Sequence, residues 1–133
     1  MEERKSYLDR VYDFIRFRFK FVSPEVAKWI ACLSGLESFF GTSQIASDCK
    51  NFFGMKLPNV RISTALGERR GHAYYSSFES SVFDFFYWCQ YAGMIQGDFK
   101  TLDGFICKFR LTKYNPNSEY CGRISNLKEQ YYG

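Results

Sequence analysis

Apolar side chains recur at helical spacing from the beginning of the chain. They predict an N-terminal helix whose buried stripe is Tyr7, Val11, Phe14, Ile15, Phe19 and Val22. Ser23-Pro24 then has the form of an N-cap followed by proline at the first helical position. The next helix has the stripe Val26, Trp29, Ile30 and Leu33, and one further turn brings Leu36 and Glu37 to its C-terminal end.

Breaks in this pattern predict the end of the second helix and the elements after it. Gly41 can stop the helix, and Thr42 or Ser43 can cap a short third helix through Ala46. Residues 51–56 are predicted as a turn. From Lys56 to Tyr75 the period shortens: Val60, Ile62 and Thr64 alternate with polar residues, glycines interrupt at 67 and 71, and an extended run resumes at 73–75. This pattern predicts a small β-hairpin with Glu68, Arg69 and Arg70 near its tip.

The remainder of the chain is predicted to be helical. Ser76 and Glu79 form a possible capping box before a helix that buries Val82, Phe85, Phe86 and Cys89 and stops near Gly93. Further helices are expected over 102–111 and about 118–131, with a turn at 115–117. The prediction is an α+β fold with one small β-element, in a single domain covering residues 1–133.

Charge and hydropathy narrow the function classes. The net charge of +4 comes without a long basic run, which argues against a nucleic-acid binder. It suits an anionic polymer such as a bacterial wall, although it also suits solubility alone. No apolar run approaches the roughly 20 residues of a membrane span. Residues 1–5 do not begin a signal core, so we expect synthesis in the cytoplasm, with a phage holin, a virion or a signal outside this sequence as the way out.

Cysteines and aromatic residues complete the compositional picture. The five cysteines contain no C-x-x-C pair, so we expect no zinc site. We also expect no other metal and no cofactor. Cys32, Cys89 and Cys107 fall on apolar helical stretches and are predicted to be buried, which fits synthesis in a reducing compartment. Aromatic residues make up 20% of the chain. They either fill the core or line a groove for the flat apolar faces of sugars, and composition leaves both open.

Glycoside hydrolysis offers one use for an acidic residue in apolar surroundings. The reaction needs a proton donor at the leaving oxygen and a group that stabilises positive charge at the anomeric carbon, and two carboxylates are the usual solution. The donor must keep its proton near neutral pH, which favours a semi-apolar pocket. Glu37 suits this role because it follows an apolar helix and lies beside Phe39 and Phe40. An ordinary exposed glutamate at a helix end is the competing interpretation.

The sequence around Glu37 is more specific. It runs Leu36-Glu37-Ser38-Phe39-Phe40-Gly41-Thr42-Ser43, then Ile45-Ala46, then Asn51-Phe52-Phe53-Gly54-Met55-Lys56. In order and spacing it resembles the signature of the glucosaminidases of glycoside hydrolase family 73: E-S-x-x-G-x-S, a hydrophobic-Ala pair, and N-x-F-G-(I/M)-K. Segments 74–81 and 114–120 are similar to later family motifs. Asn115 stands where the family usually has Asp, and one extra residue precedes Tyr120. The resemblance covers residues from about 24 to 127.

The resemblance implies a lysozyme-like fold with a cleft between a helical lobe and a small β-hairpin lobe. It implies an endo-β-N-acetylglucosaminidase that cleaves peptidoglycan glycan strands between N-acetylglucosamine and N-acetylmuramic acid. By position, Glu37 matches the general acid. Glu68, the acidic residue of the hairpin, is the candidate second carboxylate, with a solvated turn residue as the alternative. Tyr120 is the third predicted catalytic residue. The predicted substrate-binding residues are Tyr114, Asn51, Phe53 and Tyr75, although Asn51 and Phe53 also suit a mainly architectural role.

Two other functions stay open at this stage. A lytic transglycosylase shares the Glu-Ser start and uses one glutamate, but its usual later G-L-M-Q segment is absent. A wall-binding or virion-structural module could keep the fold without activity. The predicted site of action is the bacterial cell wall, with a virion or a lysis system as a possible setting.

Overall fold

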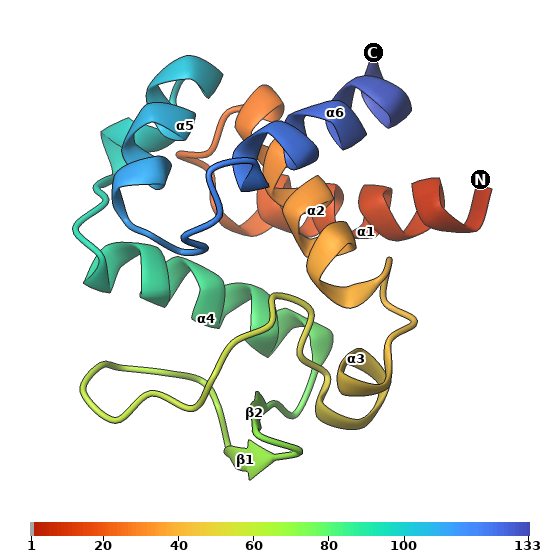
Figure 1. Cartoon of the computed structure of the whole chain (residues 1–133), viewed down its shortest axis with the longest axis vertical. Coiled ribbons are helices and arrows are strands. Elements are labelled where there is room, and N and C mark those ends of the chain that lie inside the picture. Colours follow the sequence, from red (N-terminus) through yellow and green to blue (C-terminus); the bar gives the residue numbers. More distant parts are fainter. Residues whose placement is uncertain (1) are drawn as a thin grey trace.

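The structure, a computed structural model, describes residues 2–133 (Figure 1). In this part of the chain the helices are α1 (Glu2–Arg18), α2 (Pro24–Ser38), α3 (Gln44–Cys49), α4 (Phe78–Tyr91), the 3-10 helix η1 (Gln96–Phe99), α5 (Leu102–Leu111) and α6 (Tyr120–Tyr132). The strands are β1 (Gly67–Arg69) and β2 (His72–Tyr74). The fold is thus mostly helical with a small antiparallel sheet, which confirms the α+β prediction.

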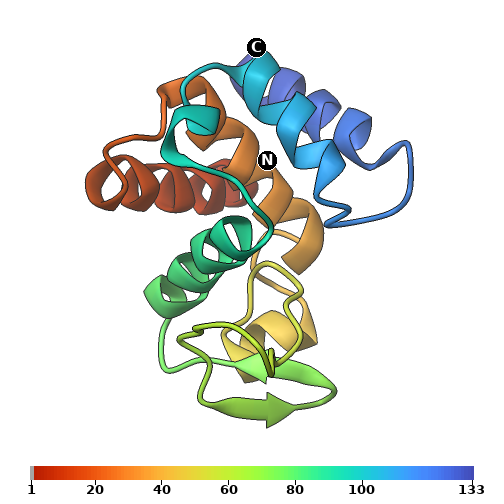
Figure 2. The ribbon, with the colours of Figure 1, turned by 90° about the vertical axis from the view of Figure 1, so that its left-hand side faces the viewer.

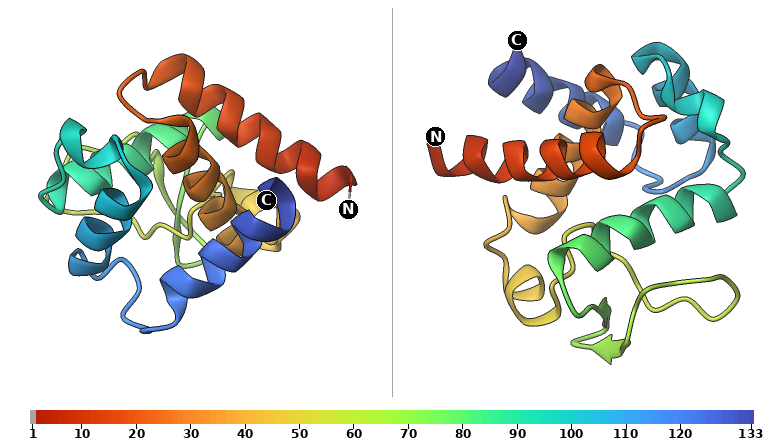
Figure 3. Two further views of the ribbon diagram at one scale, coloured as in Figure 1. Left: turned by 90° about the horizontal axis from the view of Figure 1, so that it is seen from above. Right: turned by 180° about the vertical axis from the view of Figure 1, so that it is seen from behind.

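Helix α2 lies at the centre of the helical part. Helices α1, α5 and α6 pack against it, and Figure 3 shows α1 and α6 along its two sides. All residues from 29 to 35 are buried, as expected for a helix that is surrounded by others. The ring of Trp29 meets Phe105 and Phe109 edge-on, with centroids 5.4 and 5.6 Å away. This packing holds α2, whose last turn carries Glu37, in place.

Helix α4 lies between this group of helices and the small sheet with α3 (Figure 2). Phe86 of α4 stacks on Phe19 at 4.1 Å, and Phe85 stacks on Phe53 at 4.6 Å. Most of the aromatic residues therefore fill the core, in agreement with one of the two interpretations.

The sheet is a short hairpin that is tied to the rest of the chain by backbone hydrogen bonds. Glu68 pairs with Ala73, and the turn between the strands holds Arg70 and Gly71 at φ 56° and 76°. The Ala73 amide donates to the Met55 carbonyl, and the Tyr75 amide donates to the Cys49 carbonyl. These bonds join the hairpin to the segment that follows α3.

Several element predictions are confirmed. Ser23 caps α2 with Pro24 in the first turn, and Ser43 caps α3 by accepting from the Ala46 amide at 3.1 Å. Helix α5 has the predicted bounds, and residues 51–56 lie outside helices and strands. No helix within residues 2–133 is both long and apolar enough to cross a bilayer.

Other predictions were wrong, and each has a local cause. Helix α1 ends at Arg18, so Phe19 and Val22 lie beyond it, although both are buried. The hairpin is confined to 67–74. Residues 56–65 form no strand because no second chain segment pairs with their backbone, and Val60 and Ile62 are 69% and 73% exposed.

The remaining corrections concern helix ends and one cysteine. Ser77, not Ser76, caps α4 by accepting from the Ser80 amide at 3.1 Å. The last helix begins at Tyr120 rather than near 118, and η1 had no predicted counterpart. Cys107 is exposed because it lies on the outer face of α5, whereas Cys32 and Cys89 are buried as predicted.

Candidate active site

Glu37 lies in the last turn of α2 and is half-buried. Phe39 ends the helix in the left-handed conformation at φ 50°, and its amide donates to the Gly35 carbonyl. The hydroxyl of the buried Ser38 accepts from the Gly41 amide at 2.9 Å, which fixes the turn after the helix. The segment around Glu37 is therefore held on both sides, and the carboxylate has a defined position.

A tyrosine from the far end of the chain binds this carboxylate. The Tyr120 hydroxyl donates to Glu37 Oε2 at 2.6 Å, and Tyr120 itself is 3% exposed. Burial raises the pKa of Tyr120 far above its usual value, and the nearby Tyr114 and Glu37 raise it further. Tyr120 therefore remains a protonated donor across the physiological pH range. The structure brings together two of the three predicted catalytic residues.

Tyr114 lies beside Tyr120. Its ring stacks on that of Tyr120 with centroids 6.1 Å apart, and its hydroxyl donates to the Phe53 carbonyl. Burial, followed by the charge of Glu37, raises the pKa of Tyr114. Its hydroxyl is thus a donor committed to the backbone of the turn after α3.

The turn after α3 passes directly over the Glu37 carboxylate. Gly54 has φ +69°, and a Cβ at this position would lie 2.8 Å from Glu37 Oε1. Asn51 shapes this turn from inside: its amide donates to the carbonyls of Met55 and Ala73, and its Oδ1 accepts from the Phe53 and Met55 amides. Asn51 is 1% exposed. Its observed contacts are architectural.

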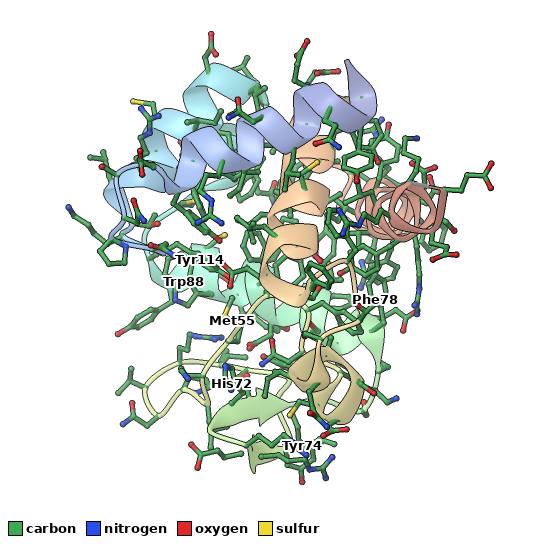
Figure 4. The ribbon with its side chains drawn as sticks, turned by 45° about the vertical axis from the view of Figure 1, so that its right-hand side comes forward. Met55, His72, Tyr74, Phe78, Trp88 and Tyr114 are labelled. Atoms are coloured by element: carbon green, nitrogen blue, oxygen red, sulfur yellow. The ribbon has the colours of Figure 1, made fainter. Side chains whose placement is uncertain are left out.

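A groove of about 460 Å³ opens over Glu37. Its lining combines the turn at 53–55, the following loop to Arg61, and Trp88, Tyr91, Tyr114 and Asn115. Figure 4 shows Met55, Trp88 and Tyr114 converging on this region from three different segments. The rings of Trp88 and Tyr114 meet edge-on at 4.8 Å. Glu37 is the acidic member of the lining, so the groove combines one carboxylate with apolar ring surface.

The predicted substrate-binding residues differ in their access to the groove. Tyr114 and Phe53 line it, although Phe53 is 1% exposed. Tyr75 is 3% exposed and points into the protein, where its hydroxyl donates to Asp84 Oδ2 at 2.5 Å. Asn51 and Tyr75 do not belong to the lining, so a direct contact between either residue and a ligand stays a prediction.

Glu68 lies apart from Glu37. It is exposed on β1 and is not among the residues that line the groove. Its neighbours Arg69 and Arg70 both turn to Asp48: Arg70 forms an ion pair with it at 2.6 Å, and Arg69 donates to its carbonyl at 2.9 Å. A second carboxylate at the reacting centre therefore stays a prediction that would require the hairpin to approach the groove.

A buried ion pair holds the loop that forms the outer wall of the groove. Arg61 donates to both carboxylate oxygens of Asp84, at 2.7 and 3.2 Å, and their side chains are only 6% and 0% exposed. Sequence reasoning missed this pair. Asp84 interrupts an apolar helical run, and such an isolated acidic residue is a signal for a buried cationic partner.

Trp88 and Tyr91 were also missed. They lie three residues apart on α4, which places them on one face of the helix, and Tyr91 is 58% exposed. That spacing was visible in the sequence, but it does not reveal which face of α4 the groove would use.

Two further observations delimit the site. A larger cavity of about 540 Å³ lies on another face of α4, beside η1, but its lining has no carboxylate that could act as an acid. Among residues 2–133 there is no group of three or more His, Cys, Asp or Glu side chains arranged to hold a metal ion. The groove over Glu37 is the better candidate active site.

No protein-family profile matches the chain. A segment of 53 residues, 40% of the chain, is 38% identical to the protein Bax of Escherichia coli K12, and the match spans only 19% of that protein's length. The fold is similar to a solved chain from a type VI secretion system effector-immunity complex of Pseudomonas protegens. The TM-score is 0.73 at 18% identity, with coverage of 97% of this chain and 91% of that one.

Proposed function

We propose that the protein is a peptidoglycan hydrolase of the endo-β-N-acetylglucosaminidase type, with a lysozyme-like fold in which the groove is the substrate cleft. The observation that carries the proposal is the placement of Glu37. Its carboxylate lies in the groove, accepts from Tyr120 at 2.6 Å, and has Gly54 directly above it. A single positioned carboxyl group beside apolar rings suits proton donation to a glycosidic oxygen.

In the proposed reaction, Glu37 in its acid form transfers its proton to the glycosidic oxygen between N-acetylglucosamine and N-acetylmuramic acid. The C1–O bond breaks, its electron pair stays on the oxygen, and the muramic acid leaves with a free hydroxyl. Positive charge then develops at C1 and on the ring oxygen. Water adds to C1, and its proton returns to Glu37, which restores the starting state.

The group that stabilises the positive charge is either Glu68 or the acetamido group of the substrate itself. Glu68 is exposed and outside the groove, so its participation requires movement of the hairpin. The substrate's acetamido group requires no movement of the protein. Tyr120 and Tyr114 lie close enough to Glu37 to orient the sugar that carries this group.

The structural neighbour supports this account. It is a chain from a type VI secretion system effector-immunity complex, which fits an effector that acts on a bacterial wall. Action at the bacterial wall, in a lysis system, a virion or a secretion system, would give this chain its substrate. Glycan strands are the proposed partner.

A lytic transglycosylase is the second candidate, and one observation favours it: Glu37 is the only acidic residue among those that line the groove. In that reaction Glu37 would act first as the acid and then as the base, and the muramyl 6-hydroxyl would replace water at C1. The product would carry a 1,6-anhydro ring.

The products of digestion distinguish these functions. Purified peptidoglycan would be incubated with wild-type protein and with Glu37→Gln, and the new ends would be identified by mass spectrometry after reduction. Reduced N-acetylglucosamine ends that disappear with Glu37→Gln are the expected result. Anhydromuramyl ends would assign the transglycosylase reaction. The absence of products from the wild type would overturn the proposal in favour of a wall-binding or structural module.

A further inference from the structure

A second pocket adjoins the groove on the other side of the tyrosine pair. It has a volume of about 360 Å³ and lies between the end of α5, the segment 113–118 and the start of α6. Tyr114 and Asn115 line both the pocket and the groove. Tyr120 forms part of the pocket wall while its hydroxyl binds Glu37, so the pocket lies directly behind the candidate acid.

The charged lining of this pocket is cationic. Its lining includes Arg110 and Lys113 and contains no acidic residue. Within residues 2–133, neither Arg110 nor Lys113 forms an ion pair. The cations of the groove itself are engaged elsewhere: Arg61 pairs with Asp84, and Lys56 donates to the Gly71 carbonyl at 3.1 Å. Arg110 and Lys113 are therefore the cations available for an anion near Glu37.

The amide side chains of the pocket add hydrogen-bond donors. Asn115 Oδ1 accepts from the Asn117 amide, and Asn117 Oδ1 accepts from the Glu119 amide, both at 2.9 Å. Their carbonyl oxygens are thus used within the loop, which leaves the two NH₂ groups for a ligand. Asn115 occupies the position at which the resembled family usually has Asp. In this chain the replacement removes the carboxylate that would otherwise oppose an anion here.

The backbone that carries the two cations is held in a tight turn. Lys113 has φ 59°, and its amide donates to the Arg110 carbonyl at 3.3 Å, so a tight turn sets the two residues beside each other. Tyr114 follows directly and is anchored to Phe53 through its hydroxyl. The stacked rings of Tyr114 and Tyr120, 6.1 Å between centroids, separate the pocket from the reacting centre.

We propose that this pocket binds a carboxylate of the muramyl substituent of the substrate, through Arg110 and Lys113. The inference rests on the proposed function, because it assigns a part of the same polymer to a second site. N-acetylmuramic acid carries a lactyl group that is extended by a stem peptide, and such peptides have free carboxylates. The pocket shares Tyr114 and Asn115 with the groove, so it adjoins any sugar bound at Glu37, and its cationic lining suits the charge of this substituent.

The test compares native sacculi, free of phosphate-containing polymers, with sacculi whose carboxylates have been amidated. For the wild type we expect amidation to raise KM about fivefold to tenfold, as two exposed charge pairs would. The double variant Arg110→Gln/Lys113→Gln should have a raised KM on native sacculi and no response to amidation. The control Lys108→Gln/Arg123→Gln loses the same charge outside the pocket and should keep the wild-type response.

A third substrate shows whether the carboxylate must lie on the stem peptide. Amidase treatment removes the stem peptide and frees the lactyl carboxylate, which is held as an amide in native sacculi. If the KM of these strands equals that of native sacculi, a carboxylate on the lactyl group itself is sufficient; if it equals that of amidated sacculi, the carboxylates of the stem peptide are required.

The inference and the proposed function can fail separately. Equal KM values on native and amidated sacculi, with normal cleavage, would overturn the inference and leave the proposed function standing. If the wild type cleaves neither substrate, the proposed function fails. Titration with soluble N-acetylmuramyl-L-alanyl-D-isoglutamine then decides the inference: weaker binding to Arg110→Gln/Lys113→Gln supports it, and equal binding or no binding overturns it.

Discussion

The groove wall that carries Glu37 and the wall that faces it are held in different ways. Glu37 ends a helix whose preceding residues are buried, and its carboxylate is bound by Tyr120, which is 3% exposed. The facing wall is a loop without regular structure, in which Val60 is 69% exposed, and it leads to a hairpin of six paired residues with Glu68 on its surface. Glu37 is fixed by packing, whereas the outer wall depends on a few side-chain anchors.

This difference between the two walls indicates that they have different roles in the proposed reaction. Proton transfer requires a position accurate to a fraction of an ångström, which packed helices provide. A polymer with variable substituents requires a wall that can adapt, and segments with few buried contacts open most readily. Under this account, changes on the helical wall should reduce the rate, whereas changes on the outer wall should mainly affect stability and substrate binding.

The largest expected effect is that of Glu37→Gln. Removal of a general acid should lower the rate of glycan cleavage by about 10²- to 10⁴-fold while the fold is kept. The measurement is the release of reducing ends, with melting temperature as the check on folding. Glu129→Gln, an exposed charge on α6, is the matched control and should keep full activity. Glu68→Gln should lower the rate less than Glu37→Gln does. An equal loss of rate would show that the two walls do not differ in their roles.

The next effect concerns the anchor of the outer wall. Asp84→Ala leaves the Arg61 guanidinium buried without its partner, and we expect a loss of about 3–5 kcal/mol in the free energy of unfolding. Urea denaturation measures it. Tyr75→Phe removes only the hydroxyl that donates to Asp84 and should cost about 1–2 kcal/mol. Equal stability of Asp84→Ala and the wild type would show that the pair does not hold the loop.

Gly54→Ala tests the contact between the turn and the acid. The left-handed backbone should cost about 1–2 kcal/mol, and the new Cβ, 2.8 Å from Glu37 Oε1, should displace the carboxylate and lower the rate. Gly93→Ala is a matched control because Gly93 also has a positive φ, 98°, but its Cβ would meet nothing within 4 Å. We expect both variants to lose similar free energy of unfolding, and only Gly54→Ala to lose catalytic rate. Parallel rate losses in both variants would contradict the contact.

The smallest of these effects is that of Tyr120→Phe. Loss of the hydroxyl that orients Glu37 should lower the rate by about tenfold, in line with one hydrogen bond to a charged group. Tyr131→Phe is the control, since its buried hydroxyl has no hydrogen-bond partner within residues 2–133. That variant should keep its activity and its stability. An unchanged rate for Tyr120→Phe would remove Tyr120 from the catalytic machinery.

The helical part and the position of Glu37 were predictable from the sequence because both depend on local signals. The Ser23-Pro24 cap and the stripe from Val26 to Leu33 place the end of α2, and Glu37 is identified by its neighbours. The contact between Tyr120 and Glu37 spans 83 positions. The resemblance implied that both residues belong to one active site, which no local pattern could do, but the hydrogen bond itself was not predicted.

The outer wall was less predictable for a physical reason. Alternation at Val60 and Ile62 predicts a strand, but a strand needs a partner, and the backbone of residues 56–65 has none. Their position depends instead on Arg61 reaching Asp84, a contact between segments 23 positions apart. A period-2 pattern cannot distinguish these outcomes.

The central claim is that the groove over Glu37 is where the glycan is cleaved, and a structure of Glu37→Gln bound to a tetrasaccharide of alternating N-acetylglucosamine and N-acetylmuramic acid tests it most directly. We expect the oligosaccharide to lie along the groove, with one glycosidic oxygen within hydrogen-bond distance of the side chain at position 37. We also expect one sugar face to lie against Trp88. An oligosaccharide seated instead in the aromatic cavity beside η1, or no ordered sugar at saturating concentration, would contradict it.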